Sequence, residues 1–512
     1  MLVKIASAAV LGLEAYQVEI EIDSSRGLPG QSIVGLPDAA VRESRDRVRA
    51  AIENSGFEFP PGYFTINLAP ANTRKEGPLY DLPIALGMLL VSEQITAIEL
   101  ADTLVVGELS LDGGVRPVSG LLAICFSLAK SHRRILVPKE NAAEAALIKG
   151  LEVIPVSSLK EAAEYLSGQT KIKPYQVDLE KLLSVPSEDL LDLIDVKGQG
   201  HVKRALEVAA AGGHNILLVG SPGSGKTMLA RRLPTILPPL SLNEALEVTK
   251  IYSVVGLLAE KGSLVTRRPF RTPHHTTSDI GVIGGGRIPR PGEVSLAHFG
   301  VLFLDEFPEF DRRVLEVLRQ PLEDGQVTIS RAHSALTYPA KFMLVASMNP
   351  CPCGRLYDAK PGCSCSPTQV HNYWRKLSGP LLDRIDLQLE VSRLKVDELA
   401  ALPQGESSKI VRQRVIAARQ LQLDRFGGQQ VFCNAHMAPQ QIRKYCFLEP
   451  EAKQLLKAAI VHLNLSARAY DKILKVARTI ADLVGVSTIE TQHIAEAIQY
   501  RSLDKKGGEA RV

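Results

Sequence analysis

Short runs of apolar residues recur through the middle of the chain, at 216–219, 301–304 and 342–346. Each run is flanked by segments whose apolar residues repeat at helical spacing. Runs of this length without polar alternation indicate strands that are buried on both faces. We therefore predict a doubly wound α/β core, with a parallel sheet between layers of helices, over residues 191–395.

The N-terminal region has a different pattern. Residues 18–23 alternate apolar and polar side chains as a half-buried strand does, and helices are predicted over 38–54 and 120–130. Short strands mixed with helices indicate an α+β domain over residues 1–165. The polar stretch 166–190 has little periodicity, and we interpret it as a linker.

The last part of the chain is predicted to be helical. Apolar positions recur at helical spacing over 411–423, 451–463 and 467–483. This pattern indicates a C-terminal helical lid domain over residues 396–512.

The composition limits the classes of partner. The 512 residues carry a net charge of +4, which is too small to indicate a polyanionic partner, so any nucleic-acid surface must be local. No apolar run approaches the ~20 residues of a membrane span. The apolar stretch 5–13 is short for a signal peptide and runs into a strand-like pattern. We expect a cytoplasmic protein without a membrane partner.

A glycine-rich segment directly follows the first apolar run. Its sequence, GSPGSGKT at 220–227, has the spacing of a phosphate-binding loop, in which glycines let backbone N–H groups surround the phosphates. The lysine is expected to reach the β- and γ-phosphates of ATP, and the threonine to hold Mg²⁺. An ordinary glycine-rich turn is the alternative. The predicted ATP contacts are Gly220, Ser221, Pro222, Gly223, Ser224, Gly225, Lys226, Thr227 and Met228.

Polar residues follow the other two apolar runs. The second run ends in Asp305 and Glu306. We expect Asp305 to bind Mg²⁺ together with Thr227, and Glu306 to orient and deprotonate the attacking water. Asn349 follows the third run and is a candidate to position the same water, the alternative being a simple Asn-Pro turn.

Two arginines are candidates for contact with the γ-phosphate. Arg384 lies between Asp383 and Asp386. An arginine supplied to a neighbouring subunit's site stabilises charge on the transferred phosphoryl group, whereas the alternative is a local salt-bridge cluster. Arg468 opens the predicted helix at 467 and is the lid's candidate, with Arg478 in reserve. A solvated helical arginine is the alternative there.

Taken together, the motifs resemble those of AAA+ ATPases of the magnesium-chelatase and MCM branch. In that comparison 220–227 corresponds to Walker A and 301–306 to Walker B. Asn349 corresponds to sensor 1, Arg384 to the arginine finger and Arg468 to sensor 2.

Three further segments narrow the resemblance to the ComM/YifB family of bacterial magnesium-chelatase-like proteins. They are RTPHHT at 271–276, NPCPCG at 349–354 and SGPLLDRID at 378–386. The resemblance covers essentially the whole chain. It implies an ATP-driven hexameric helicase that promotes branch migration of incoming DNA during natural transformation. It also implies single-stranded and branched DNA as partners, and it allows recombination proteins.

The N-terminal region resembles Lon-type proteases in two segments, 74–81 and 115–122. The catalytic serine and lysine of those proteases would fall on Leu79 and Leu122, which supply neither a hydroxyl nor an amine. We therefore expect a Lon-protease-like fold without the Ser-Lys chemistry, reused for assembly or DNA contact.

Two segments are candidates for contact with DNA. Residues 267–290 are rich in arginine and contain three consecutive glycines, and 323–338 predicts a hairpin. Arginines on such loops suit contacts with phosphates that ignore sequence, whereas an ordinary surface loop is the alternative. In the related helicases both insertions point into the ring pore. The predicted DNA contacts are Arg267, Arg271, Arg287 and Arg331.

Four of the seven cysteines are closely spaced, as Cys351 and Cys353 followed by Cys363 and Cys365. Four thiolates can close a tetrahedral Zn²⁺ site. Free or redox-active thiols and an iron–sulfur cluster are the alternatives.

Other functions remain open from the sequence. The main one is a magnesium-chelatase-like ATPase that remodels a protein partner, which needs no arginine-rich loop. An ATP-dependent protease conflicts with Leu79 and Leu122, and a non-catalytic ATP switch conflicts with Glu306 and Arg384.

Overall fold

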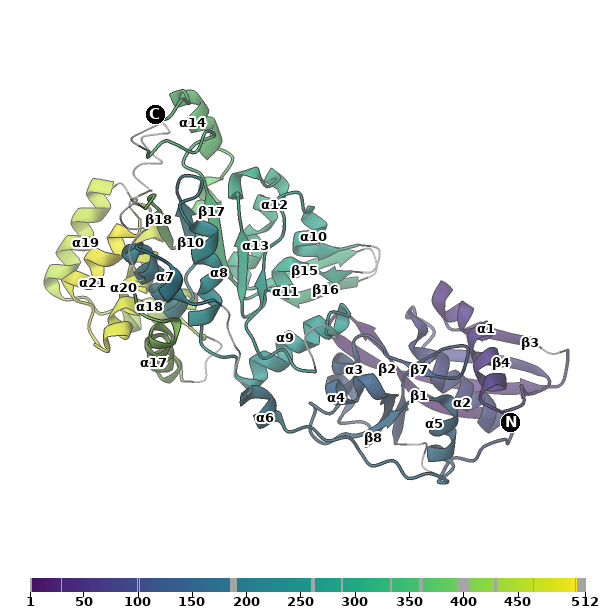
Figure 1. The fold of residues 1–512 in the computed structure, drawn as a ribbon. Coiled ribbons are helices and arrows are strands. Elements are labelled where there is room, and N and C mark those ends of the chain that lie inside the picture. The colour runs from purple at the N-terminus through teal and green to yellow at the C-terminus, as the bar shows by residue number, and fades with distance from the viewer. Residues whose placement is uncertain are drawn as a thin grey trace. The chain divides into compact units, whose positions relative to one another are not determined.

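A computed structural model describes residues 2–28, 30–98, 100, 102–184, 191–258, 263–286, 289–331, 334–358, 362–394, 405–427, 431–463, 465–501 and 503. The chain divides into two compact units (Figure 1). Residues 1–185 and 241–266 form the first unit, and residues 186–240 and 267–512 form the second. Within the ranges given, no helix is long and apolar enough to cross a membrane.

The first unit is built on a seven-stranded mixed sheet with the order β3-β4-β2-β1-β5-β8-β9. The β1–β2 hairpin is antiparallel and pairs Leu2 with Asp23 at one end and Leu11 with Glu14 at the other. The remaining pairs are parallel except β2–β4. The strands are β1 (Leu2–Leu11), β2 (Glu14–Ser25), β3 (Gly30–Val34), β4 (Tyr63–Ala69), β5 (Thr103–Val105), β8 (Arg134–Pro138) and β9 (Glu152–Val156), with a separate two-stranded sheet of β6 (Glu108–Leu109) and β7 (Val115–Arg116).

The elements of this unit also bury the residues that are apolar in the sequence. After Asp81 the sequence of α2 is apolar on all sides, and every residue of the helix is buried. The alternating stretch at 18–23 lies within β2, as its period-2 pattern predicts. The helices are α1 (Ala39–Asn54), α2 (Asp81–Val91), α3 (Leu121–Leu128), α4 (Ala142–Ala145), α5 (Leu159–Leu166), α6 (Leu179–Ser184) and α9 (Leu242–Val254).

One helix of the first unit comes from a segment that lies within the second unit's part of the sequence. The segment 241–266, which was predicted to belong to the α/β core at 191–395, clusters with the first unit instead. Ser253 of α9 donates its hydroxyl to Glu144 at 2.5 Å and accepts the Gly120 N–H on its carbonyl at 2.9 Å. Burial raises the pKa of Glu144. These contacts dock α9 beside α3.

The second unit contains a five-stranded parallel sheet with the order β11-β14-β17-β10-β18. Its strands are β10 (Ile216–Val219), β11 (Phe270–Arg271), β14 (Val301–Leu304), β17 (Met343–Met348) and β18 (Leu387–Glu390). All residues of β10, β14 and β17 are buried, as expected for strands covered on both faces. The predicted mixed α/β class with a parallel sheet is confirmed.

Helices and two small hairpins complete this part of the second unit. The helices are α7 (Gly200–Gly212), α8 (Lys226–Ile236), α10 (Asp279–Ile283), α11 (Glu293–Leu296), α12 (Arg312–Val317), α13 (Arg319–Asp324), α14 (Pro367–Trp374) and α15 (Gly379–Leu382). The hairpins are β12 (Gly284–Gly285) with β13 (Arg290–Pro291), and β15 (Gln326–Arg331) with β16 (Ser334–Pro339).

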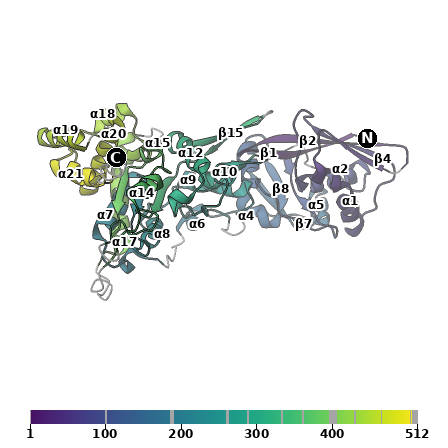
Figure 2. The same ribbon diagram turned by 90° about the horizontal axis from the view of Figure 1, so that it is seen from above.

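The C-terminal region is helical, as predicted. Its helices gather on one side of the unit in both views (Figures 1 and 2). Arg478 of α20 is buried and donates to Asp482 and to the carbonyls of Val486 and Ser487. The prediction that Arg478 could contact the γ-phosphate in place of Arg468 is therefore wrong, because its guanidinium makes its hydrogen bonds within the helical region. The helices are α17 (Ser408–Phe426), α18 (Pro439–Tyr445), α19 (Pro450–Leu463), α20 (Ala467–Val484) and α21 (Thr491–Gln499).

Candidate nucleotide site

The segment 220–225 forms the turn between β10 and α8, as a phosphate-binding loop does. Gly223 and Gly225 have φ values of 78° and 91°, in the left-handed region that favours glycine. A Cβ placed on Gly220 would lie 2.2 Å from the carbonyl oxygen of Val391. These glycines are therefore required by the turn itself, before any ligand is considered.

Lys226 lies at the first turn of α8 and points back over the loop. Its Nζ donates to the carbonyls of Gly220 at 2.6 Å and Ser221 at 3.0 Å, and lies 3.4 Å from Oδ1 of Asn349. Burial lowers the pKa of Lys226, and the nearby Asp305 carboxylate opposes that shift. The structure thus brings together Lys226 and Asn349, which are 123 residues apart in the sequence.

Thr227 and Asp305 are also in contact. The Thr227 hydroxyl donates to Oδ2 of Asp305 at 2.8 Å, and the hydroxyl of Ser347 donates to Oδ1. The residues come from α8, from the end of β14 and from β17, whose carboxyl ends meet at one edge of the sheet. Sequence reasoning did not single out Ser347, although a serine inside the apolar run of β17 is the signal that marks it.

Glu306 has a left-handed backbone with a φ of 54°, and 58% of its side chain is exposed. Its Oε2 lies 3.4 Å from Nδ1 of His275, whose ring lies against that of His274 with centroids 4.2 Å apart and planes tilted by 33°. The sequence motif at 271–276 therefore lies beside the acid that is the candidate base. Nothing in the spacing of His275 and Glu306 predicted this contact.

Arg384 and Arg468 lie away from the loop that precedes α8. Both line a cavity of about 560 Å³ that is also lined by Gly213 and Asn215, which precede β10, whereas the loop follows it. β10 is four residues long, so its first and last Cα atoms are about 10 Å apart. Arg384 pairs with Glu323 and donates to the Pro380 carbonyl at 2.7 Å.

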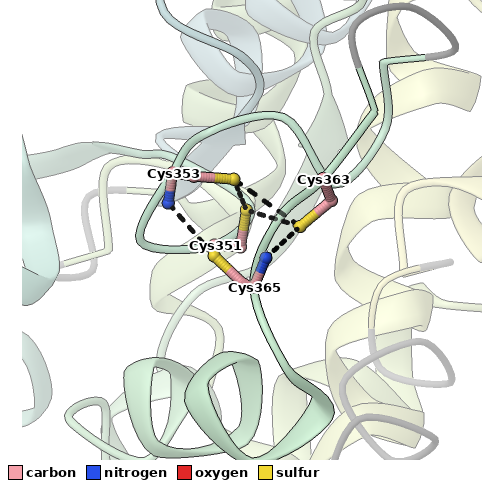
Figure 3. A group of neighbouring side chains, drawn as sticks. All are labelled: Cys351, Cys353, Cys363 and Cys365. Atoms are coloured by element: carbon pink, nitrogen blue, oxygen red, sulfur yellow. Dashed lines mark hydrogen bonds between the residues drawn. The ribbon is translucent and has the colours of Figure 1, made fainter.

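The four clustered cysteines converge in the loop between β17 and α14 (Figure 3). The sulfur of Cys351 lies 3.4 Å from that of Cys353 and 3.6 Å from that of Cys363, and all four ligand atoms lie within 4.8 Å of one another. Zn–S bonds of about 2.3 Å place tetrahedral sulfurs about 3.8 Å apart, so the donor set fits the ion.

Local hydrogen bonds favour the thiolate form at one of these positions. Backbone N–H groups of Ser364 and Arg355 lower the pKa of Cys353. Burial raises the pKa of Cys351. A bound metal ion would replace the thiol protons of both Cys351 and Cys353. Both would then be thiolates, because the cation stabilises them.

The segments that were expected to contact DNA lie side by side. The Tyr338 hydroxyl of β16 donates to the Pro289 carbonyl at 2.7 Å, and a Cβ on Gly284 would lie 3.0 Å from Cδ1 of Ile329. Arg271 is held by Glu293 in a two-point ion pair at 2.6 and 2.8 Å, so its guanidinium is already engaged. Arg287 and the side chain of Arg331 lie outside the described residues, and Arg267 is exposed.

The first unit gives no sign of the protease dyad at the expected positions. Leu79 and Leu122 are both buried in its apolar interior. The Leu122 N–H donates to Oε1 of Glu144 at 2.9 Å, the carboxylate that Ser253 also contacts. The position at which a catalytic lysine would fall is thus a buried leucine, and its backbone shares the Glu144 carboxylate with α9.

Comparison with known families matches almost the entire chain. The family models are magnesium chelatase subunit ChlI at residues 192–399, subunit ChlI of Mg-chelatase at 20–141 and the ChlI C-terminal region at 405–501. The uncharacterized protein YifB of Escherichia coli is 47% identical over 97% of this chain and 96% of its own length. The competence protein ComM of Haemophilus influenzae is 43% identical over 97% of both chains. The magnesium-chelatase 38 kDa subunit of Rhodobacter capsulatus is 26% identical over 30% of this chain and 49% of its own.

Proposed function

The chain belongs to the magnesium-chelatase-like family that includes YifB and ComM, and from this premise we propose that it is an ATP-driven DNA motor that promotes branch migration. Membership of the family suggests an ATPase. One observation supports ATP hydrolysis most directly. At one edge of the parallel sheet, Lys226 contacts Asn349 and Thr227 contacts Asp305. The name of the competence protein ComM supports a role in recombining incoming DNA during natural transformation.

ATP and Mg²⁺ fit this edge of the sheet. Lys226 leaves its two loop carbonyls and contacts the β- and γ-phosphates, while the N–H groups of 220–227 surround them. Thr227 and Asp305 hold Mg²⁺, which neutralises charge on the phosphates when bound. Glu306 takes the proton of the attacking water and Asn349 orients that water.

The second half of each site comes from a neighbouring subunit. Arg384 and Arg468 line one cavity at the far end of β10, so they are too distant from their own loop to contact the same nucleotide. An arginine supplied in trans stabilises the transferred phosphoryl group. This requires a ring, and the resemblance to hexameric motors favours six copies.

DNA contacts the two neighbouring hairpins. The β12–β13 hairpin contacts the β15–β16 hairpin through the Tyr338–Pro289 hydrogen bond. In the sequence, Arg287 lies between β12 and β13, and Arg331 is the last residue of β15. Arg267 adds an exposed cation. We leave Arg271 out of this surface because Glu293 neutralises it.

Zn²⁺ is the metal proposed for Cys351, Cys353, Cys363 and Cys365. The four sulfurs already have nearly the separations that a tetrahedral ion requires. The protein is thus expected to hold ATP, Mg²⁺ and one structural Zn²⁺.

DNA-stimulated ATPase activity tests the proposal. Arg287→Glu combined with Arg331→Glu should lower DNA affinity and the stimulation while ATP binding is unchanged. Arg312→Glu, on an exposed arginine of α12, is the matched control. An ATPase that ignores DNA in the unmodified protein would contradict the motor and favour a chelatase-like ATPase acting on a protein partner, which the similarity to the Rhodobacter subunit supports.

A further inference from the structure

The loop that carries the four cysteines lies directly against the phosphate loop. Gly354, between the two cysteine pairs, has a φ of 77°, and a Cβ placed on it would lie 2.6 Å from Cδ of Pro222. That distance leaves no room for a side chain, so the backbone of one loop touches the proline ring of the other. The Gly354 N–H donates to the Cys351 carbonyl at 2.9 Å, which ties the contact to a cysteine of the cluster.

A second contact is polar. Asp358 lies between Cys353 and Cys363, and its Oδ1 accepts the Ser221 hydroxyl at 2.6 Å. Only 10% of the Asp358 side chain is exposed. A carboxylate this well buried needs partners, and Ser221 is the one that belongs to the phosphate loop.

Arg393 completes the connection from the other side. Its Nε lies 3.6 Å from Oδ2 of Asp358, and its Nη2 donates to the Pro222 carbonyl at 3.2 Å. The ion pair of Asp358 and Arg393 therefore contacts two consecutive residues of the phosphate loop. Its acid, which belongs to the cysteine loop, contacts Ser221, and its arginine contacts Pro222. The conformation of Ser221 and Pro222 depends on where Asp358 is held.

The position of Asp358 depends in turn on the cysteines. In the described part of 351–365 there is neither a helix nor a strand. Such a segment has no backbone ladder to fix its shape, and a bound metal is then the main constraint on it. Without a metal, the four thiols offer one another only weak hydrogen bonds, so the loop would lose its main crosslink.

We propose that Zn²⁺ at the four cysteines braces the phosphate loop through Gly354 and Asp358, so that occupancy of the metal site sets the affinity for ATP. The inference rests on the ATP and zinc sites proposed above. Because coupling between two ligands is reciprocal, bound ATP must stabilise the zinc site by the same factor.

The first experiment measures the zinc affinity of the full chain. The Glu306→Gln variant, purified without chelator, is brought to equilibrium with a chromophoric zinc chelator of known affinity. MgATP should raise the zinc affinity about tenfold relative to buffer with Mg²⁺ alone. Equal zinc affinities with and without ATP overturn the proposal.

The second experiment separates the brace from the metal site. Asp358→Ala keeps all four cysteines, so it should retain one zinc per chain yet bind a fluorescent ATP analogue about tenfold more weakly. Cys446→Ser changes a cysteine outside the cluster and should leave both quantities unchanged.

Each failure has a different meaning. Zinc-loaded Asp358→Ala that binds the analogue like the unmodified chain overturns the brace alone. Absence of zinc from every preparation overturns the brace together with the zinc site, while analogue binding still supports the ATP site. Absence of analogue binding in the zinc-loaded, unmodified chain overturns the proposed nucleotide site, and the brace with it.

Discussion

The Thr227 hydroxyl donates a hydrogen bond to Oδ2 of Asp305 at 2.8 Å, which joins the start of α8 to the end of β14. In the proposed site, Thr227 and Asp305 are the residues that would hold Mg²⁺, and the ion would neutralise charge on the phosphates of ATP. We expect Asp305→Asn to lower the ATPase rate at least ~100-fold, because a metal clamp supplies several kcal/mol of transition-state stabilisation.

Phosphate release at saturating MgATP measures this effect. Glu316→Gln, an exposed acid on α12, is the control and should keep the normal rate. An Asp305→Asn protein that hydrolyses ATP at the control's rate would show that Asp305 is not a metal residue.

The contact between His275 and Glu306 predicts a restraint on hydrolysis. Nδ1 of His275 and Oε2 of Glu306 are 3.4 Å apart, so the imidazole holds the carboxylate that is the candidate base for hydrolysis. An exposed pair of this kind is worth up to ~1 kcal/mol, so His275→Ala should raise the DNA-free ATPase rate up to about fivefold. The rate with saturating DNA should change less.

His371→Ala, on α14, controls for the loss of a histidine elsewhere. ATPase rates with and without DNA decide the question. A His275→Ala protein whose DNA-free rate equals the control's would mean that the contact does not restrain Glu306.

The proposed role of Arg384 predicts that two inactive variants restore activity to each other in a mixed ring. Arg384→Ala should bind ATP normally but hydrolyse it poorly, because each chain would lack the arginine that its neighbour needs. Lys226→Ala should abolish ATP hydrolysis in the site of the chain that carries the substitution. Mixed rings of the two variants contain some interfaces with both an intact phosphate loop and an intact arginine, so mixing should restore part of the activity.

The double variant Lys226→Ala, Arg384→Ala mixed with Arg384→Ala forms no such interface and is the control. ATPase assays after subunit exchange give the result. Mixing that restores nothing beyond this control argues that Arg384 serves only the ion pair with Glu323.

The buried pair of Cys433 and His436 predicts the pH dependence of stability. Burial alone would raise the pKa of Cys433, but the charges of His436 and Arg419 lower it to about 5. The thiolate raises the pKa of His436 above 6.5, and the two atoms Sγ and Nδ1 are 3.2 Å apart. Between about pH 5 and the raised pKa of His436, the folded pair therefore holds one proton, on the imidazole.

The unfolded pair binds two protons below pH 6.5, one up to pH 9 and none above. Stability should therefore rise with pH from about 5 to 6.5 by about 1.4 kcal/mol per unit and stop rising above pH 6.5. Cys433→Ser should flatten the acid side of this profile. Thermal unfolding midpoints between pH 5 and 9 test it, and an unchanged slope in the variant would contradict the thiolate assignment.

The elements that the sequence predicted well are those specified locally. The apolar run 216–219 and the glycines after it define β10 and its turn, because burial and positive φ are properties of those residues themselves. The same holds for β14 followed by its two acids. The helical periodicity over 467–483 likewise predicted α20, whose bounds are Ala467–Val484.

The relationships that the sequence did not predict depend on tertiary contact. Ser221 and Asp358 are 137 residues apart, and no spacing rule pairs a phosphate-loop serine with an acid in a cysteine loop. His275 reaches Glu306 only because β11 lies beside β14 in the sheet. The sequence also did not predict that α9 packs in the first unit, because that packing depends on Glu144, a buried acid far from α9 in the sequence.

Branch migration itself is the most direct test of the central claim. A three-stranded DNA junction with a labelled strand is incubated with the unmodified chain or with Glu306→Gln, each with MgATP, and strand exchange is followed on a gel. The unmodified chain should drive exchange only with ATP, and Glu306→Gln should bind ATP and the junction without moving it. Exchange that proceeds equally well with Glu306→Gln, or no exchange while the unmodified chain hydrolyses ATP, would contradict an ATP-driven DNA motor.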